Sequence, residues 1–249
     1  MGHVAGRISW GAKIGISPST STPKFALRLP EPMKCLIVGA RADGHAKVVL
    51  EVLCAGGNHE VVGFIDDDPG KQGHKIKDKS VLGTMSDVPR LMNMHAISAG
   101  IVAIGDNHRR RELSTRLKGF GLQLINAMHP TAHCDGDVML GEGCYIGQGV
   151  IIIAGTRIGN CVNIHTGATI DHDNVIGDGA NLGPGVHTAG RVNIGMDAFL
   201  GTGTVVVPDA RVGQGAVCGA GTVVIKHVDP YTKVVGNPAR VIEQLKEPE

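Results

Sequence analysis

Aliphatic residues recur at every sixth position through the second half of the chain. Counting in sixes from Cys134 to Val224 gives sixteen positions, of which only Thr188 is polar. A second small or branched residue usually follows four positions later, as Val138 and Val150 do. A short fixed period indicates a solenoid, and a hexapeptide period is typical of a parallel β-helix. We therefore predict one strand per hexad, three hexads per 18-residue coil, and residues 18 apart stacked about 4.8 Å from each other.

The chain before the hexads has a different pattern, in which short apolar runs alternate with amphipathic stretches. This order predicts a small, Rossmann-like parallel sheet with helices on its faces, that is, an α/β domain over residues 33–127. Residues 128–249 are then the all-β domain with a C-terminal tail, and Met128–Ala132 link the two. The predicted strands are 35–40, 61–65, 100–104 and 122–125, and the predicted helices are 46–55, 85–92 and 109–119.

Residues 1–32 fit neither pattern. They contain a Ser/Thr/Pro cluster from Ser17 to Pro23 and no acidic residue before Glu31. The apolar core of a secretory signal is missing, whereas the composition is similar to that of a transit peptide. We interpret the segment as a disordered or non-native extension before Met33, with the transit peptide as the alternative.

Composition excludes several classes of protein. Aromatic residues are only 3% of the chain and glycines number 37, which suits a narrow solenoid with tight corners and an aliphatic interior. The formal net charge of +1 comes without a basic run, so we predict neither a nucleic-acid nor a membrane partner. Six cysteines without a C-x-x-C pair favour a reducing, cytoplasmic location over a disulfide framework.

Three polar segments follow predicted strands of the first domain. They are the turn Gly39–His45, the pair Asp66 and Asp67, and the stretch Gly105–Asn107. Open α/β sheets bind ligands at the carboxyl ends of their strands, and a glycine turn before a helix favours phosphate. The turn matches neither the dinucleotide fingerprint nor the P-loop. Solvated loop acids and helix caps are the alternative interpretation of these residues.

A second candidate site is Asp171-His172-Asp173, at a predicted corner of the solenoid. We call the aliphatic residue at each sixth position the guide residue. Most corners have glycine or a small residue directly after the guide residue, whereas three polar residues stand here. A histidine beside a carboxylate can act as a general base near neutral pH. Solenoid corners are usually polar, so a solvated corner is the alternative.

Other polar residues of the solenoid suggest no metal site. His165, His172 and His187 are separated by 7, 15 and 22 residues, never by 18, so they share no column, and we predict no zinc or other metal. Asn163 and Asn181 are 18 apart, and their default interpretation is a ladder of side-chain amides.

Taken with the turn Gly236–Arg240, these motifs give residues 34–243 a resemblance to one enzyme family. The chain resembles the hexapeptide-repeat acetyltransferases of the sialic-acid O-acetyltransferase (NeuD) and nucleotide-linked 4-amino-sugar N-acetyltransferase (PglD) family. The resemblance implies a left-handed β-helix, a homotrimer with active sites between subunits, and acetyl-CoA between adjacent β-helices. It also implies that His172 is the general base and Asp173 its acidic partner.

The resemblance assigns binding residues as well. Those implied to lie along acetyl-CoA are Gly190, Ala220, Pro238, Asn181 and Arg240. Those implied to bind the nucleotide-linked sugar, against the first domain for the most part, are Gly39, Ala40, Asp66, Asp67, Ala103, Gly105, Asn107 and His165.

Three departures from the family pattern stand out. The first turn is two residues longer, because of Arg41-Ala42-Asp43. A histidine common nine residues after the base is Asn181 here, and an asparagine found seven residues before it in some members is His165.

The resemblance and the residues together predict an acetyl-CoA-dependent N-acetyltransferase. Its acceptor would be the 4-amino group of a UDP- or GDP-linked amino-dideoxy sugar, acetylated directly with a histidine base. O-acetylation of a sialic-acid-type sugar is an alternative, because a hydroxyl acceptor needs a base at the same place. A non-catalytic trimeric scaffold that binds nucleotide sugars is an alternative of another class.

Overall fold

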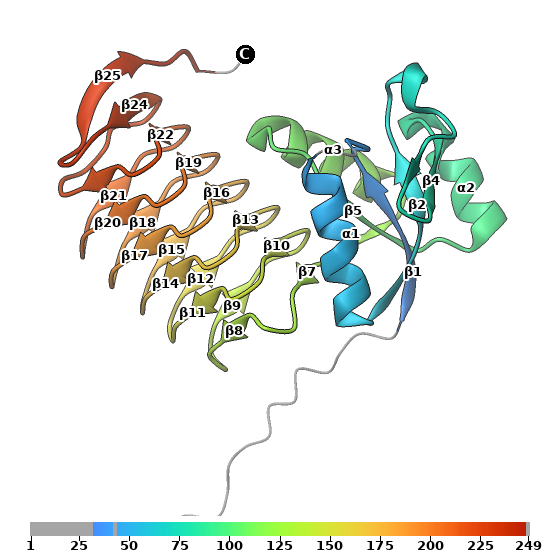
Figure 1. Ribbon diagram of the computed structural model, residues 1–249, viewed down its shortest axis with the longest axis horizontal. Helices are drawn as coiled ribbons and strands as arrows, with labels where there is room; N and C mark the ends of the chain where they lie inside the picture. The colour runs from blue at the N-terminus through green and yellow to red at the C-terminus, as the bar shows by residue number, and fades with distance from the viewer. Residues whose placement is uncertain (1–31, 42–43, 248–249) are drawn as a thin grey trace, which may run out of the picture.

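The structure is a computed structural model that describes residues 32–41 and 44–247. Figure 1 shows two domains side by side, a small α/β domain and a long parallel β-helix. The predicted extension lies outside the described residues except for Pro32. Within the described ranges, no helix is long and apolar enough to cross a membrane.

The N-terminal domain is built around the buried strand β1. Its six-stranded sheet has the order β3-β4-β2-β1-β5-β6, and β1 pairs in parallel with both β2 and β5. The bounds are β1 Met33–Val38, α1 His45–Gly56, β2 His59–Ile65, η1 Pro69–Lys71, β3 Lys75–Ile76, β4 Lys79–Gly83, η2 Met85–Asp87, α2 Val88–His95, β5 Ala99–Val102, α3 Asn107–Gly119 and β6 Gln123–Leu124.

Side chains of β1 alternate between two cores, as the period of a strand requires. Cys35 and Ile37 pack with the apolar face of α1, whereas Leu36 and Val38 pack with residues of α2 and α3 such as Leu91. The sheet is therefore covered on both faces, with α1 on one side and α2 and α3 on the other (Figure 1).

The hairpin β3–β4 was not predicted from the sequence. Its strands are short, and the antiparallel pairs are Lys75 with Ser80 and Ile76 with Lys79. The turn between them places Lys77 at φ 56°, a conformation that residues other than glycine seldom adopt. Because β3 is only two residues long, it leaves no alternating pattern that sequence reasoning could detect.

Sixteen two-residue strands follow the predicted hexads of the second domain. Each ends on the predicted guide residue, and residues 18 apart pair in parallel, as Ile152 does with Ile170. Their bounds are β8 His133–Cys134, β9 Met139–Leu140, β10 Tyr145–Ile146, β11 Ile151–Ile152, β12 Arg157–Ile158, β13 Asn163–Ile164, β14 Thr169–Ile170, β15 Val175–Ile176, β16 Asn181–Leu182, β17 His187–Thr188, β18 Asn193–Ile194, β19 Phe199–Leu200, β20 Val205–Val206, β21 Arg211–Val212, β22 Val217–Cys218 and β23 Val223–Val224.

The strands form three sheets, which we call I, II and III. Sheet I has the order β25-β24-β22-β19-β16-β13-β10-β7, sheet II β23-β20-β17-β14-β11-β8, and sheet III β21-β18-β15-β12-β9. Sheet I includes β7 (Ala127–Met128), which pairs with β10, so Met128 belongs to the β-helix and not to a linker. The tail adds β24 (Thr232–Val235) and the antiparallel β25 (Arg240–Gln244).

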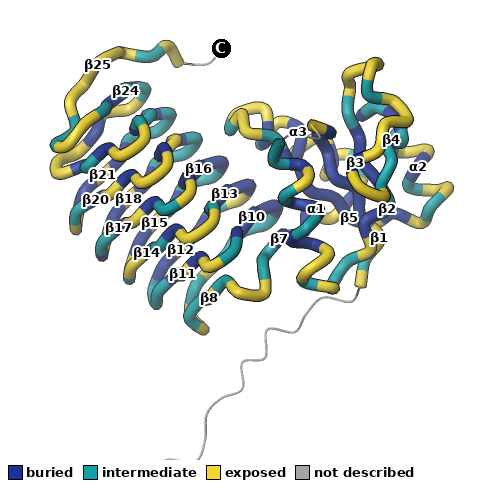
Figure 2. The backbone as a smooth tube through the Cα atoms, viewed as in Figure 1, coloured by how far each residue is buried: buried dark blue, intermediate teal, exposed yellow. Residues whose placement is uncertain are grey.

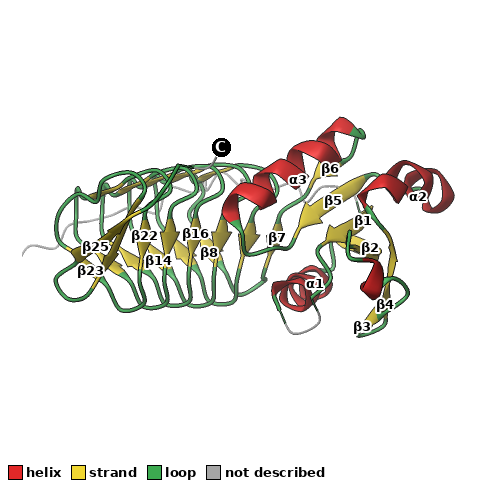
Figure 3. Ribbon diagram, turned by 90° about the horizontal axis from the view of Figure 1, so that it is seen from above, coloured by secondary structure: helices red, strands yellow, loops and turns green. Residues whose placement is uncertain are grey.

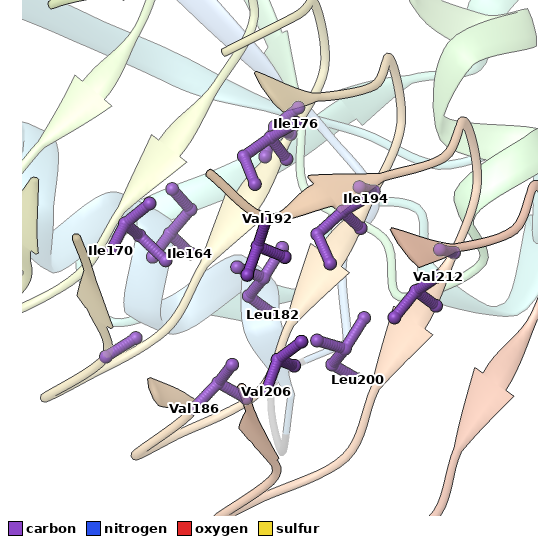
Figure 4. Packing of buried hydrophobic residues seen from close by; sticks show 14 of the residues in the cluster. Ile164, Ile170, Ile176, Leu182, Val186, Val192, Ile194, Leu200, Val206 and Val212 are labelled. Carbon is purple, nitrogen blue, oxygen red and sulfur yellow. The ribbon is translucent and has the colours of Figure 1, made fainter. Parts of the chain in front are cut away.

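The guide residues fill the interior of the β-helix. Ile164, Ile170, Ile176 and their equivalents in later coils point inward and stack along the axis (Figure 4). Figure 2 shows this buried lining along the inside of the coils, with exposed backbone at the corners. The β24–β25 hairpin covers one end of the core and the N-terminal domain lies at the other, as solenoid ends require (Figure 1).

A buried arginine joins the two domains. Helix α3 reaches over the coils (Figure 3), and the fully buried guanidinium of Arg110 donates to the backbone oxygens of Cys161 at 2.8 Å and Gly179 at 2.7 Å. It also donates to the backbone oxygen of Ile104 at 3.1 Å and to the side-chain oxygen of Asn107 at 3.0 Å. Burial lowers the pKa of Arg110 to about 10, so the group stays a cation at neutral pH.

We predict that Arg110→Met destabilises the protein strongly. The change leaves buried carbonyl groups on both domains without a donor, and each such loss costs about 1–3 kcal/mol. The free energy of unfolding in urea should therefore fall by about 3 kcal/mol or more. Arg116→Met, at an exposed position of the same helix, is the matched control and should change it by less than about 0.5 kcal/mol. Equal effects of the two substitutions would contradict this role of Arg110.

Candidate active site

The predicted base lies at the corner between sheets II and III, which we call the II–III corner. Nδ1 of His172 is 2.8 Å from Oδ2 of Asp173, and Oδ1 of Asp171 accepts from the backbone N–H of His172 at 2.8 Å. A carboxylate only accepts hydrogen bonds, so Asp173 places the imidazole proton on Nδ1 and leaves a lone pair on Nε2. The His172 side chain is about half exposed, and the imidazole is therefore accessible from outside the coil.

Gly190 makes room for that imidazole one coil further along. A Cβ atom on Gly190 would lie 2.4 Å from Nε2 of His172, far inside van der Waals contact. Only glycine therefore allows the observed position of the ring. Arg191, which follows Gly190, forms a forked ion pair with Asp209 at 2.7 and 2.9 Å. Hydrogen bonding from Arg191 lowers the pKa of Asp209, and desolvation acts in the other direction.

A second group of predicted residues lines a pocket of the N-terminal domain. Val38, Gly39, Ile65, Asp66, Asp67, Ile104, Arg109 and Leu113 surround a cavity of about 180 Å³. Gly39 has φ 99°, and a Cβ there would lie 2.7 Å from the Ile104 side chain, so this close approach requires glycine. The pocket lies at the carboxyl ends of β1, β2 and β5, where an open α/β sheet binds its ligands.

Asp66 organises the entrance of this pocket. Its carboxylate accepts from the backbone N–H of Ala40 at 2.8 Å, from that of Asp68 at 3.0 Å and from Nζ of Lys71 at 2.9 Å. Burial opposes ionisation of the group, but these three donors outweigh it and lower the pKa of Asp66. Asp67 accepts from the backbone N–H of Met85 at 2.7 Å and so ties η2 to the same edge.

A third cavity, of about 220 Å³, lies between the domains, and we call it the interdomain pocket. It is lined by His45, Gly105, Asn163, His165, Asn181, Gly183, Pro184, Phe199 and Thr202. His45, the first residue of α1, packs edge-on against Tyr145 of the β-helix at a ring separation of 4.6 Å, and its ring lies 5.2 Å from that of His165. The side chains of Asn163 and Asn181 are buried in sheet I.

The residues implied to bind acetyl-CoA lie at several separate places on the β-helix. Ala220 precedes β23 at the corner between sheets I and II, and the turn with Pro238 lies against the same strand, where Val223 bonds Gly236 and Ala239. Arg240 lines a cavity of about 280 Å³ with Lys226 and His227 at the end of the β-helix. Gly190, by contrast, lies beside His172 at the II–III corner, across sheet II from Ala220.

One chain therefore does not bring all predicted residues together. His172, Asp173 and Gly190 form one group, and Gly39, Asp66 and Asp67 form another on the opposite side of the molecule. His165 and Asn181 join the interdomain pocket, which lies on sheet I. A further cavity, of about 470 Å³ between α3 and the C-terminal tail, includes only Gly105 and Asn107 of the predicted set.

Comparisons with known proteins show what the chain is similar to. Residues 34–117 match the family described as PglD N-terminal domain. The structure of PerB from Caulobacter crescentus, in complex with CoA and GDP-perosamine, is 37% identical, with a TM-score of 0.79, over 84% of this chain and 97% of PerB. The acetyltransferase domain of PglB from Neisseria gonorrhoeae, in complex with acetyl coenzyme A, is 30% identical, with a TM-score of 0.76, over 85% of this chain and all of that domain.

The chain belongs to the PglD family of hexapeptide-repeat acetyltransferases. These comparisons confirm the predicted family and the acyltransferase class. They also confirm the left-handed β-helix behind an α/β domain, and acetyl-CoA as the co-substrate. A curated relative, an uncharacterised protein of Acanthamoeba polyphaga mimivirus, is 31% identical over 119 residues, and the chain spans only 22% of its length.

The assignments of single residues stay predictions, and the structure adds detail to several. Ala103 is buried, its backbone N–H donates to the backbone oxygen of Val38, and it does not belong to the lining of the pocket in the N-terminal domain. The amide of Asn107 donates to the backbone oxygen of Asp197 at 2.9 Å, and its oxygen accepts from Arg110. Its side chain therefore takes part in the contact between the domains.

One interpretation of the sequence is wrong. Asn163 and Asn181 stack in register, but they form no amide ladder, since Nδ2 of Asn163 has no hydrogen-bond partner among the described residues. The side-chain oxygen of Asn181 instead accepts a hydrogen bond from Nε2 of His165 at 3.2 Å. Both residues depart from the family pattern, and here they contact each other. In the part of the chain that the structure describes, no cluster of His, Cys, Asp and Glu could hold a metal ion.

His45 was predicted only as the last residue of the glycine turn, without a role of its own. Only the fold shows that it begins α1 and packs against Tyr145 of the β-helix.

We predict that Asp66→Asn reduces stability in a pH-dependent way. Because the folded state lowers the pKa of Asp66, its stabilising effect is complete above the unfolded pKa, about 3.9, and is lost as the pH falls through the folded value. The wild type should therefore unfold at a higher urea concentration than the variant at pH 7, and the difference should shrink below about pH 4. A difference that stays constant down to pH 2 would contradict the assignment.

Proposed function

We propose that this protein transfers an acetyl group from acetyl-CoA to the 4-amino group of a nucleotide-linked amino-dideoxy sugar. The observation that carries the proposal is the His172 imidazole, held by Asp173 at Nδ1 with the lone pair of Nε2 next to Gly190. A neutral ring fixed in this tautomer is suited to accept a proton. The relatives PerB and PglB, whose structures hold CoA or acetyl-CoA, support the co-substrate.

The reaction needs a base but no covalent enzyme intermediate. The amine nitrogen attacks the thioester carbonyl, the C–N bond forms, the C–S bond breaks and CoA leaves as its thiol. His172 accepts the proton that the amine loses and returns it to the leaving sulfur, so protons balance over the cycle. A backbone N–H such as that of Gly190 stabilises the developing oxyanion. The buried thiols of Cys144 and Cys218, with pKa values raised to about 12 by burial, are poor nucleophiles.

The acceptor is held by the N-terminal domain. The nucleotide occupies the pocket of Gly39, Asp66 and Asp67, whose carboxylates can accept from ribose hydroxyl groups or base N–H groups. The diphosphate then lies near the start of α1, where backbone N–H groups face an anion. PerB, crystallised with GDP-perosamine, supports this class of acceptor.

The placement of these groups supports a homotrimer with shared active sites. In one chain the N-terminal domain covers sheet I and its corner with sheet III, through contacts such as Arg110 with Gly179. His172 lies at the II–III corner, away from that domain. A second subunit can bring its II–III corner to the acceptor of the first, with acetyl-CoA between the two β-helices. Arg240 and Lys226 offer positive charge to a CoA phosphate at the open end of this path.

Substitution of His172 tests the proposal. With a UDP- or GDP-linked 4-amino-4,6-dideoxy sugar, we expect kcat for CoA release by His172→Ala to fall at least about 100-fold, since positioned acid–base catalysis contributes about 10²–10⁴-fold. Gly190→Ala should cause a similar loss while the fold is kept, because the added Cβ displaces the imidazole. His133→Ala, which removes an exposed imidazole of the first coil, should keep nearly full activity.

Three outcomes would contradict the proposal. Unchanged turnover in His172→Ala would exclude this residue as the base. Acetyl-CoA binding without turnover of any amino sugar, but with acetylation of a sialic acid, would replace the amine acceptor by a hydroxyl acceptor. Binding of acetyl-CoA and nucleotide sugar without any turnover would support the scaffold instead.

A further inference from the structure

An asparagine lies inside the β-helix, directly behind the corner that bears His172. Sixteen residues follow a guide residue by four positions, and all of them are Val, Ala, Thr or Cys except Asn174. The side chain of Asn174 is completely buried. Val192, its equivalent in the next coil, points into the aliphatic core (Figure 4). Because burial of an amide is unfavourable unless hydrogen bonds replace its hydration, the contacts of Asn174 must account for its presence.

The amide nitrogen of Asn174 joins two successive corners. Nδ2 lies 2.7 Å from the backbone oxygen of Asp171, 3.2 Å from that of His172 and 2.9 Å from that of Ala189. Carbonyl oxygens only accept hydrogen bonds, so the NH₂ group and not the amide oxygen faces them. Asp171 belongs to the corner of His172, whereas Ala189 directly precedes Gly190. One buried side chain therefore ties the backbone beside His172 to the backbone beside Gly190.

Thr156 supports the same corner from the preceding coil. Its hydroxyl group donates to the backbone oxygen of Asp171 at 3.0 Å and accepts from the backbone N–H of Asn174 at 3.3 Å. Thr156 is buried too, and it stands 18 residues before Asn174 in the same interior column. The backbone at the start of the His172 corner is therefore bonded, from the core side, to residues of the coils before and after it.

This arrangement is not the one that would stabilise the β-helix most. Oδ1 of Asn174 is buried and has no hydrogen-bond partner within the described residues, and a buried acceptor without a partner is destabilising. Asp173, between His172 and Asn174, has φ 58°, a left-handed conformation that residues other than glycine seldom adopt. A valine, as the next coil has at Val192, would leave no amide oxygen unpaired. Stability alone therefore does not explain an asparagine here.

We infer that Asn174 is the positioning residue for His172. The His172 side chain is about half exposed, so core packing does not hold the imidazole, and its position depends on the backbone of the corner. Asn174 bonds that backbone to Ala189 and so keeps Nε2 of the ring beside Gly190. A displacement of about 1 Å at a catalytic group can lower the rate about 100-fold. The inference rests on the proposed function and adds a residue that acts through its base.

Two nearly isosteric substitutions test the hydrogen bonds of Asn174. Thr204, at the same position of its own hexad, donates to the backbone oxygens three residues before it and fifteen after it, at 2.8 and 3.3 Å. Asp171 and Ala189 have the same spacing from Asn174, so a threonine can keep both bonds and a valine keeps neither. We expect kcat for CoA release to fall at least about 10-fold in Asn174→Val and to stay within about threefold of wild type in Asn174→Thr. The KM values for acetyl-CoA and the nucleotide sugar should change by less than about threefold, since substrate binding does not depend on this contact.

Val150→Ala is the matched control for loss of stability. Val150 is as buried as Asn174 and has the same position in its hexad, but it lies at the corner between sheets I and II. The substitution leaves a cavity without touching the corner of His172, so kcat should stay within about twofold of wild type at a temperature where every variant is folded. Equal kcat values for Asn174→Val and Asn174→Thr, or an equal fall in Val150→Ala, would overturn the inference.

Coupling to His172 separates positioning from a purely structural role. Once His172→Ala has removed the imidazole, Asn174 has no base to position, so adding Asn174→Val should lower the residual kcat by less than about twofold. The same fall in the presence and in the absence of the imidazole would contradict the role of Asn174.

Amide hydrogen exchange of the full chain without substrate tests the corner independently of the reaction. The backbone N–H of Arg191 donates to the backbone oxygen of His172 at 2.9 Å, and so it reports on the contact between the two corners. It should exchange at least about 10-fold faster in Asn174→Val, and within about threefold of wild type in Asn174→Thr and Val150→Ala. Unchanged exchange in Asn174→Val would overturn the inference. The expected exchange pattern in a protein that acetylates no amino sugar would contradict the proposed function and still support the role of Asn174 in holding the corner.

Discussion

The in-register stacking of 18-residue coils is the constraint on which the rest of the structure depends. Each inward aliphatic residue lies on its equivalent in the next coil, so the interior fixes the position of every corner residue. The same register places Gly190 next to His172 and aligns Asn163 with Asn181. A slip of one residue would turn the guide column outward, so the core and the candidate site cannot shift independently.

The contact between the domains determines which surfaces of the β-helix remain available. Arg110 and the ion pair of Arg111 with Asp197, in which Nε lies 2.7 Å from Oδ1, join α3 to the corner between sheets III and I. His45 and Tyr145 extend that contact over sheet I. Among the described residues the N-terminal domain leaves the II–III corner with His172 uncovered, and this separation is what supports the proposal of a site shared between subunits.

The sequence predicted the regular parts well because their signals are local and repeated. The sixteen guide positions and the three longer helices depend on periodicity, and so they appear in the chain without knowledge of the fold. The hairpin of β3 and β4 was missed, since β3 has only two residues and, unlike the two-residue strands of the β-helix, belongs to no repeat. His172, Asp173 and Gly190 were identified through corner chemistry and family resemblance, and the structure adds their contact.

The interdomain pocket could not have been predicted from spacing. Its residues come from α1, from the end of β5 and from three coils, and only tertiary packing joins them. Asn163 and Asn181 have the spacing of a ladder, but a histidine two residues after Asn163 competes for the amide of Asn181. Residues 18 apart share a column, whereas His165 and Asn181 are 16 apart and are diagonal neighbours.

The most direct test of the shared active site is complementation between two inactive subunits. One subunit carries His172→Ala with an intact nucleotide pocket, and the other carries Asp67→Lys in that pocket with an intact His172. If each site takes its pocket from one subunit and its base from the next, random mixed trimers should recover about a quarter of the wild-type sites. Activity that stays at the level of the two separate variants would contradict the account.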